Sequence, residues 1–393
     1  MEQRRYYTFD LISLLLGYEE SASTWRAFLF VILCLKQYTK HQISILRFRN
    51  ENNNSKGSDS VDEITRQTKR RSKRKKIWIF ALIFLLSIVG VGTAYGANLY
   101  KKAENVANTA YKGLNRGEKS KKREGQVKPL QDNISILIMG VDENEKRKKS
   151  YGGAMRTDAL LLATINKDDK SVKLLSIPRD TRVYIPFKEK RDKINHAHAY
   201  GGVDGTIETV EDFLDVPVDY YVKFNFESFV TIVDSLGGID VDVPVTFTEQ
   251  DSQDHQKAIH IEKGKRHLDG EEALALARTR KIDSDAMRGQ RQQLVLEAIA
   301  KKALSFDSIT KLSDVLEAVD GEIKTNISFS DMKDLSTNML KSPLKMDKLQ
   351  IKGEDERISG IYYYQPDKES VNETTEILQK HLGVTSKSEH KKI

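Results

Sequence analysis

The chain has 393 residues, enough for two or three domains of ordinary size, so its length does not limit the burial of a core. The single cysteine, Cys34, excludes an intramolecular disulfide and a zinc site built from cysteines. Residues 1–97 hold 16 Lys and Arg against 8 Asp and Glu, or +8, and the total of +7 therefore leaves −1 for residues 98–393. A nucleic-acid-binding domain should carry its positive charge on the folded surface, so no nucleic-acid partner is expected.

Residues 77–97 contain no charged side chain over about the 20 residues that are needed to span a bilayer, and they predict a transmembrane helix. A basic run, residues 66–76, comes directly before them, and the positive-inside rule then places residues 1–76 in the cytoplasm as a basic, disordered tail. A cleaved signal peptide is the alternative, but the apolar run is long for one. Residues 98–132 are expected to form a helical or flexible extracellular stalk.

Three short apolar runs after the stalk predict neighbouring strands, at residues 134–139, 159–165 and 171–177. A polar turn joins the second and third runs, which indicates a hairpin. A hairpin places Asp158, before the second strand, close to Arg179, after the third. If the first strand pairs antiparallel with the second, Asp142 reaches the same edge of the sheet.

Helices and strands alternate in the remainder of the chain, with helices expected over residues 206–214, 226–236, 270–277 and 286–304 and strands over residues 217–224, 239–243 and 362–364. Gly237 and Gly238 should end the second of these helices, because glycine adopts the left-handed conformation. This order is typical of an α/β domain. We expect a mixed central sheet covered by helices on both sides, an α-β-α arrangement over residues 133–385, with one transmembrane helix before it and a tail, residues 386–393, after it.

The segment between the last two predicted helices is rich in arginine. Arg288 and Gln292 are four residues apart on the second helix and can point the same way, while Arg278 and Arg280 approach from the other side. Planar guanidinium groups bind phosphate in a bidentate manner and stay charged at any working pH, so the pattern fits a site for more than one phosphoryl group. A solvated basic helix face is the alternative.

Asp142 and Asp158 beside these arginines suggest a magnesium site, although each alone is an ordinary turn or strand-start residue. Magnesium is usually held by one or two protein carboxylates, with phosphate oxygens and water completing its shell. A phosphorylated ligand would then supply the remaining oxygens, and Arg179 and the other arginines would offset its charge. His196 and His198 lack partner ligands at a recognisable spacing and do not predict zinc.

Six ordered motifs resemble the LytR-CpsA-Psr family, and LytR-type members in particular. They are Gly140-Val141-Asp142, Arg156-Thr157-Asp158, Ser176-Ile177-Pro178-Arg179-Asp180-Thr181, Lys193-Ile194-Asn195-His196-Ala197, Gly237-Gly238-Ile239, and the run from Arg278-Thr279-Arg280 to Arg291-Gln292-Gln293. The resemblance is strong over residues 133–300 and weaker to residue 383.

The resemblance implies a phosphotransferase outside the membrane of a Gram-positive bacterium. Such enzymes move an anionic glycopolymer, for instance teichoic acid or capsule, from a polyprenyl pyrophosphate carrier to peptidoglycan. By match to the family motifs, Asp142 and Asp158 would hold Mg²⁺ or Mn²⁺. The pyrophosphate would be bound by Arg156, Arg179, Lys193, Arg278, Arg280, Arg288 and Gln292. Arg179 is also a catalytic candidate, and Asp285 is the candidate for orienting the arginines or accepting the proton of the acceptor hydroxyl.

Two other functions stay open at this point. A membrane-bound transcriptional regulator would use residues 1–76 on DNA, but no helix-turn-helix pattern is visible there, and anionic lipids explain a basic run beside a membrane. A hydrolase would cleave the lipid pyrophosphate with water in place of a sugar hydroxyl, and the sequence does not separate the two reactions.

Overall fold

The computed structural model describes residues 60–141, 155–253, 255–279, 285–305, 312–340 and 345–384. The chain divides into two compact units, Met1–Gly92 and Thr93–Ile393. The second unit holds the central sheet and the helices that cover it.

The helix α3, Ser60–Ala110, is long and continuous. Among the described residues it contains one stretch, Trp78–Ala110, that is apolar and long enough to cross a membrane, judged by length and composition. Apolar side chains at the start of this stretch face outward, with Trp78 76% exposed and Phe84 68% exposed. The helix includes the basic run, because Lys, Arg and Gln are good helix formers. The tail expected over residues 1–76 therefore contains helix from Ser60 onward, and its disorder before that residue stays a prediction.

The second unit follows α3 with a series of short elements. In chain order they are β1 (Ile134–Val141), β2 (Thr157–Asn166), β3 (Ser171–Ser176), β4 (Arg182–Ile185), η1 (Pro186–Lys188), β5 (Lys190–Lys193), α5 (His196–Leu214), β6 (Tyr220–Asn225), α6 (Phe226–Ser235), β7 (Ile239–Val243), β8 (Phe247–Glu249), β9 (Ile259–Ile261), β10 (Gly264–Leu268), α7 (Gly270–Arg278), α8 (Asp285–Ala303), α10 (Leu312–Val319), β11 (Lys324–Thr325), α11 (Phe329–Leu340), β12 (Lys345–Gln350), β13 (Gly353–Ile358), β14 (Ile361–Pro366) and α12 (Lys368–Leu382).

The central sheet has six strands in the order β11-β6-β1-β2-β3-β12. Strands β2 and β3 pair antiparallel, as the predicted hairpin requires, and β1 also pairs antiparallel with β2, the pairing that the sequence left as a condition. Strand β6 runs parallel to β1 and β12 runs parallel to β3. The mixed sheet is therefore confirmed. Gly237 and Gly238, both with φ of 80°, end α6 as expected.

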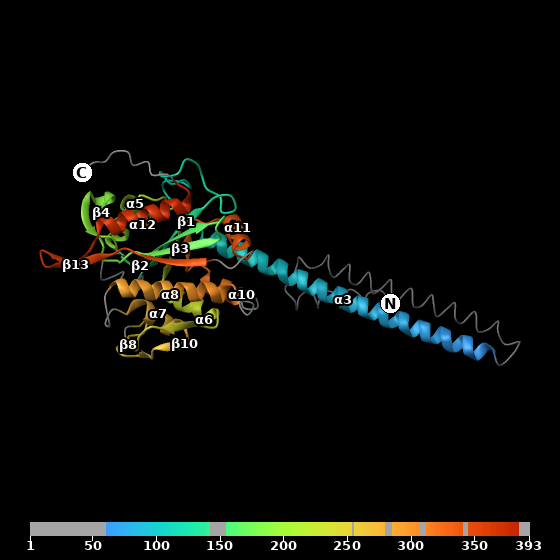
Figure 1. Ribbon diagram of the computed structural model, residues 1–393. Coiled ribbons are helices and arrows are strands. Elements are labelled where there is room, and N and C mark those ends of the chain that lie inside the picture. The colour runs from blue at the N-terminus through green and yellow to red at the C-terminus, as the bar shows by residue number, and fades with distance from the viewer. Residues whose placement is uncertain are drawn as a thin grey trace, which may run out of the picture. The chain divides into compact units, whose positions relative to one another are not determined.

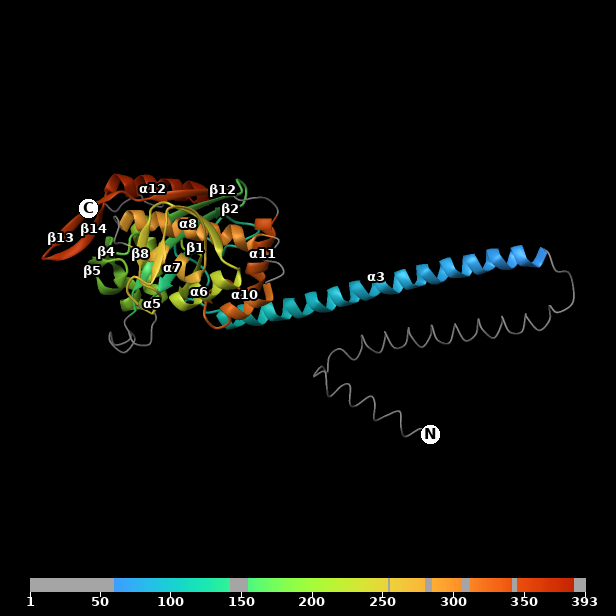
Figure 2. The ribbon, with the colours of Figure 1, turned by 90° about the horizontal axis from the view of Figure 1, so that it is seen from below.

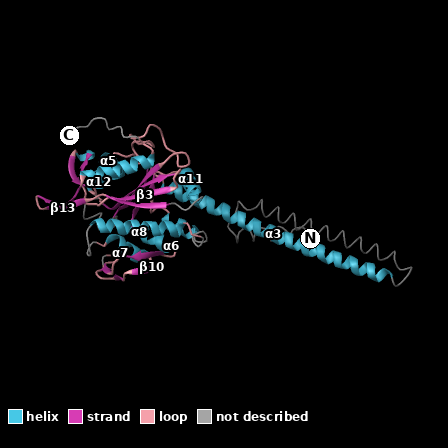
Figure 3. Ribbon diagram, viewed as in Figure 1, coloured by secondary structure: helices cyan, strands magenta, loops and turns pink. Residues whose placement is uncertain are grey.

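Helices cover both faces of the sheet (Figures 1 and 3), with α5 and α12 on one face and α6, α7 and α8 on the other. Neighbouring side chains of a strand alternate between the two layers. Leu162 of β2 lies in one buried core with Ile207 of α5 and Leu378 of α12. Its neighbour Leu161 packs in a separate cluster with Leu296 of α8. The α-β-α arrangement is confirmed.

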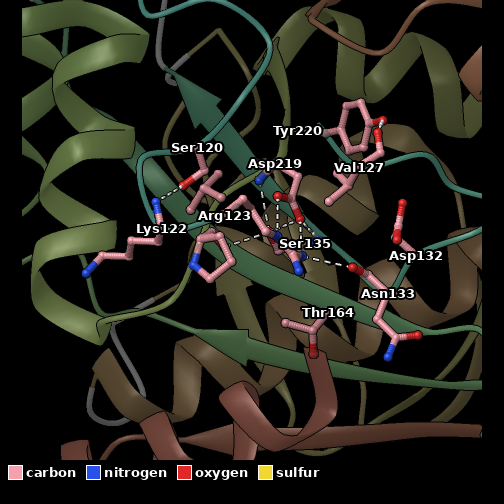
Figure 4. Close-up of polar contacts among 12 residues, drawn as sticks. Ser120, Lys122, Arg123, Val127, Asp132, Asn133, Ser135, Thr164, Asp219 and Tyr220 are labelled. Carbon is pink, nitrogen blue, oxygen red and sulfur yellow. Dashed lines mark hydrogen bonds and ion pairs between the residues drawn. The ribbon is translucent and has the colours of Figure 1, made fainter. Parts of the chain in front are cut away.

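Residues 111–133 pack against the sheet after α3 ends. Arg123 forms an ion pair with Asp219 at 2.6 Å, and the two side chains are only 9% and 2% exposed. Asp219 also accepts hydrogen bonds from the backbone N–H and the hydroxyl of Ser135, at 2.9 and 3.0 Å (Figure 4). Buried charges are stable only when they are paired in this way. Val106, Ala107 and Ala110, at the end of α3, are buried as well, so the segment expected as a stalk packs on the domain before residue 111 too. A boundary between stalk and domain stays a prediction.

Candidate functional site

A cavity of about 550 Å³ lies between the central sheet and the helices α6, α7 and α8. Along α8 its lining changes from polar to apolar, since Arg288 and Gln292 are followed by Val295, Leu296 and Ile299. These residues span about 16 Å of helix at 1.5 Å per residue. The cavity thus has a cationic end and an apolar end, which suits a ligand with a charged head and a hydrocarbon chain.

Close contact between α8 and the sheet fixes the cationic end. A Cβ atom at Gly289 would lie 2.7 Å from Oγ and 3.1 Å from Cβ of Ser176, so a larger residue would force α8 or β3 to shift. Gln293 donates hydrogen bonds to the carbonyl oxygens of Leu174 at 2.8 Å and Leu349 at 2.9 Å. The neighbouring Arg288, which is 4% exposed, is therefore held against the cavity by a fixed helix.

Arg179 and Asp158 meet at the edge of the sheet, as the predicted hairpin requires. Nη1 of Arg179 donates a hydrogen bond to Oδ1 of Asp158 and the two groups form an ion pair. Nε of Arg179 lies 3.6 Å from Oδ2 of Asp180. The guanidinium group is therefore oriented by two carboxylates before any ligand binds.

Arg278 approaches the cavity from the end of α7. Its Nη1 donates a hydrogen bond to the carbonyl oxygen of Asp251 at 3.2 Å, and its Cζ lies 5.3 Å from the centroid of the Phe226 ring. Gln292 donates a hydrogen bond to the carbonyl oxygen of Ala277 at 3.3 Å, which links α8 to α7. The aromatic ring and the linked helices restrict the directions that the two side chains can take.

The structure brings together five of the residues that the sequence selects: Asp158, Arg179, Arg278, Arg288 and Gln292 all line the cavity. Arg156 is exposed directly before β2 and is not part of the described cavity lining. Asp142 and Arg280 lie outside the described residues. Asp285 is the first residue of α8, and its side chain lies outside the described part of the chain.

Lys193 is not part of the described cavity lining. Its Nζ lies 2.9 Å from Oδ1 of Asp180. The same Nζ lies 5.6 Å from the centroid of the Tyr362 ring and 5.7 Å from that of Tyr363. Lys193 therefore contacts the site through Asp180, the neighbour of Arg179.

Glu249 is a cavity residue that sequence reasoning missed. It ends β8, is 6% exposed, and lines the cavity together with Gln250. The surrounding sequence is polar and has no periodic pattern, so no sequence signal separates Glu249 from the other acidic residues of this region. It adds a second carboxylate to the described lining.

The described residues offer a metal single carboxylates and no carboxylate cluster. Among them, no group of three or more His, Cys, Asp or Glu side chains could hold an ion. Asp158, whose side chain is 27% exposed, presents one carboxylate to the cationic end. This matches the single or paired carboxylate that Mg²⁺ uses when phosphate oxygens complete its shell.

An α-β-α domain that follows a helix long and apolar enough to cross a membrane, with arginines gathered at one end of an apolar cavity, defines an α/β protein whose cavity suits an anionic head with an apolar chain. Residues 97–380 match the model of the LytR_cpsA_psr family, and the chain belongs to this family.

Relatives of known structure support this assignment. The polyisoprenyl-teichoic acid–peptidoglycan teichoic acid transferase TagT of Bacillus subtilis is 39% identical over 322 residues, which cover 81% of this chain and 99% of TagT. A structure of TagT bound to LI-WTA is 39% identical with a TM-score of 0.59, and one of TagT with bound octaprenyl pyrophosphate lipid is 37% identical with a TM-score of 0.56. Each match covers 70% of this chain and 100% of the other.

Proposed function

We infer that this chain transfers a teichoic acid from a polyisoprenyl pyrophosphate carrier to peptidoglycan. The observation that carries this conclusion is the cavity, which joins a cluster of arginines to an apolar wall. A lipid pyrophosphate has the same two parts, and TagT, a relative over nearly its whole length, has the activity in its name.

The arginines supply positive charge where the reaction develops negative charge. The acceptor hydroxyl attacks the phosphorus next to the glycan, the bond from that phosphorus to the bridging oxygen breaks, and polyprenyl phosphate leaves with the bridging oxygen. The hydroxyl proton passes to a base, for which Asp285 is the candidate. Negative charge develops on the phosphoryl oxygens, and fixed cations such as Arg179, Arg278 and Arg288 stabilise it without reorganising.

We propose that Asp142 and Asp158 hold Mg²⁺ or Mn²⁺ at the cationic end. A divalent ion there would neutralise phosphate oxygens and make polyprenyl phosphate a better leaving group. We further propose that Arg156 and Arg280 extend the pyrophosphate site from the cavity edge. The carboxylate of Asp158 supports the first part, because it lies where a bound pyrophosphate would approach Arg179.

We propose that the apolar helix anchors the protein with residues 1–76 in the cytoplasm and the catalytic domain outside. The basic run before the helix supports this orientation. Peptidoglycan, the acceptor, lies on the outer side.

The full-length protein in detergent micelles tests the proposal directly. It is incubated with a lipid-linked glycan pyrophosphate, Mg²⁺ and peptidoglycan fragments, and products are followed by mass spectrometry. Glycan attached to peptidoglycan, absent in Arg179→Ala and retained in the exposed control Arg266→Ala, is the expected result. Release of polyprenyl phosphate without attachment would instead assign hydrolysis.

A further inference from the structure

The hairpin of β4 and β5 carries a local excess of positive charge. Residues 182–193 hold five Lys or Arg and two Asp or Glu, a net of 5 − 2 = +3. Residues 98–393 as a whole carry 7 − 8 = −1. The hairpin is therefore positively charged, whereas residues 98–393 as a whole are close to neutral.

The positive charge gathers on one face of the hairpin. Arg182 pairs with Lys193 and Tyr184 pairs with Arg191, so these four side chains share a face, which we call the cationic face. Asp192 lies on the opposite face and is 8% exposed. The cationic face itself holds three basic residues, one aromatic residue and no carboxylate.

The carboxylate of Asp192 has polar and charged partners on the face of the hairpin opposite the cationic face. Its carboxylate accepts a hydrogen bond from the Tyr200 hydroxyl at 2.8 Å and lies 3.0 Å from Nδ1 of His196 and 3.2 Å from Nζ of Lys190. Burial opposes ionisation of Asp192, but these contacts, His196 foremost, hold its pKa well below the ordinary value. Its negative charge is thus compensated away from the cationic face.

Arg182 and Arg191 keep their charge available. Within the described part of the chain, neither guanidinium group forms an ion pair. Cζ of Arg182 lies 6.0 Å from the centroid of the Tyr363 ring, which supports the side chain without neutralising it. Arg191 is exposed. Two uncompensated arginines on one face are a typical feature of an anion-binding surface.

The hairpin is attached directly to the site. Its first strand begins three residues after Arg179, and the backbone N–H of Asn195, just after its second strand, donates a hydrogen bond to the Arg179 carbonyl at 3.2 Å. Lys193 contacts Asp180 as described above. Figure 2 places β4, β5, β13 and β14 together at one end of the domain, far from α10 and α11. Val183 and Ile185 of the hairpin pack in the α5 layer, so the hairpin continues from Arg179 on the side of the sheet opposite the cavity. A chain that leaves the cationic end of the cavity would pass around the edge of the sheet at Arg179 to reach the cationic face.

We propose that the cationic face binds the phosphodiester chain of the donor polymer as that chain leaves the cavity. This inference rests on the proposed function. The pyrophosphate head occupies the arginine cluster, and each following repeat of a polyol phosphate brings one more negative charge. Diagonal neighbours on a two-stranded face, as Arg182 and Arg191 are, lie about 7 to 8 Å apart. This is of the order of the separation between phosphates joined by a three-carbon polyol.

The binding should depend on polymer length. A single exposed ion pair contributes little, because water and salt screen it. Several phosphates along one chain can engage Arg182 and Arg191 together, so affinity grows with the number of repeats until the face is covered. A donor that ends at its first sugars cannot reach the face.

A binding measurement tests the inference without relying on transfer. Fluorescently labelled, lipid-free poly(glycerol phosphate) chains of defined length are titrated with the full-length protein in detergent micelles. Affinity for wild type should rise with chain length and fall with salt. The double variant Arg182→Gln and Arg191→Gln should lose about tenfold in affinity for long chains.

Two further variants keep the result interpretable. Lys265→Gln with Arg266→Gln removes the same charge from β10, which lies on the other side of the sheet in Figure 1, and should bind like wild type. Arg182→Lys with Arg191→Lys keeps the charge and should retain most of the affinity. Equal losses in all three double variants, or no dependence on chain length in wild type, would overturn the inference.

A transfer assay separates this inference from the proposed function. With long donors, the Arg182→Gln and Arg191→Gln variant should show a raised KM and an unchanged kcat, and with donors lacking repeats it should equal wild type. A loss with both donors, or a raised KM for peptidoglycan alone, would reject the cationic face as a polymer site. Length-dependent binding by a wild type that transfers nothing would reject the proposed function and leave the binding surface standing.

Discussion

Arg179 is ion-paired with Asp158, so a predicted anion-binding residue and a predicted metal ligand hold one another at the edge of the sheet. Binding of a pyrophosphate and a divalent ion would replace this pair with two new ones. The pair therefore keeps both side chains in place and neutralises them until the ligands arrive.

If ligands replace the Arg179–Asp158 ion pair, substitutions of the two residues should change the affinity for the lipid in opposite directions. Without metal, Asp158→Asn should bind a lipid pyrophosphate a fewfold more tightly, because Arg179 loses its competing carboxylate. Arg179→Gln should bind it more weakly. Both variants should lose about a hundredfold or more in transfer. Isothermal titration in EDTA and the transfer assay measure the two quantities, and tighter binding by Arg179→Gln would contradict the exchange.

Metal removal should abolish transfer. We expect EDTA to stop the reaction and Mg²⁺ or Mn²⁺ to restore it, because carboxylates and phosphate oxygens prefer these ions. Asp158→Asn should need a higher Mg²⁺ concentration for half-maximal activity, whereas the exposed Asp240→Asn should behave as wild type. Full activity in EDTA would show that the arginines act alone.

A larger side chain at the apolar end of the cavity should weaken binding of the hydrocarbon part of the lipid and leave binding of the pyrophosphate unchanged. Ile299→Trp should displace part of the lipid, at about 0.8 kcal/mol for each CH₂ that is excluded. Binding of a long polyprenyl pyrophosphate should therefore weaken at least tenfold, and binding of inorganic pyrophosphate should not change. Ile299→Val is the matched control. Equal effects on both ligands would mean that the hydrocarbon chain binds elsewhere.

The sequence predicted the part of the site that rests on local pattern. Strong apolar runs indicated the hairpin, and with it the meeting of Asp158 and Arg179, while the four-residue spacing placed Arg288 and Gln292 on one face of α8. These features depend on hydrophobic periodicity and helix geometry, which a sequence displays directly.

The remaining features depend on contacts between distant segments. The position of Lys193 follows from Asp180 and from the rings of β14. The burial of Glu249 follows from the packing of α7 beside β9, the partner strand of β8. Strand β5 consists of charged residues and has no apolar alternation to reveal it, and β4 alternates over only four residues. Residues 111–133 resemble a linker in sequence because the partner of Arg123 lies just before β6, far along the chain.

The buried ion pair of Arg123 and Asp219 should be important for stability. Asp219→Asn leaves the guanidinium buried without its counter-charge, so we expect a loss of about 3 to 5 kcal/mol in the free energy of unfolding. Lys121 and Glu208 form an exposed pair at 3.8 Å, and Lys121→Gln should cost at most about 1 kcal/mol. Urea unfolding in detergent measures both, and equal losses would mean that burial of the pair is unimportant.

His381 should make the stability of the domain depend on pH. His381 is 5% exposed, and its Nδ1 and Nε2 lie 2.8 Å from the hydroxyls of Thr164 and Ser171, which fastens α12 to β2 and β3. Burial lowers the pKa of His381 below its ordinary value of 6.5. The unfolded chain therefore takes up the proton more readily than the folded one.

This contribution is complete above the unfolded pKa and is lost as the pH falls below 6.5 toward the folded pKa. The loss is about 1.4 kcal/mol for each unit that separates the two values. His381→Gln cannot titrate, so wild type should lose stability relative to this variant as the pH is lowered from neutral to acidic. Urea unfolding at several pH values measures the difference, and a constant difference would mean that the ring binds its proton equally well in both states.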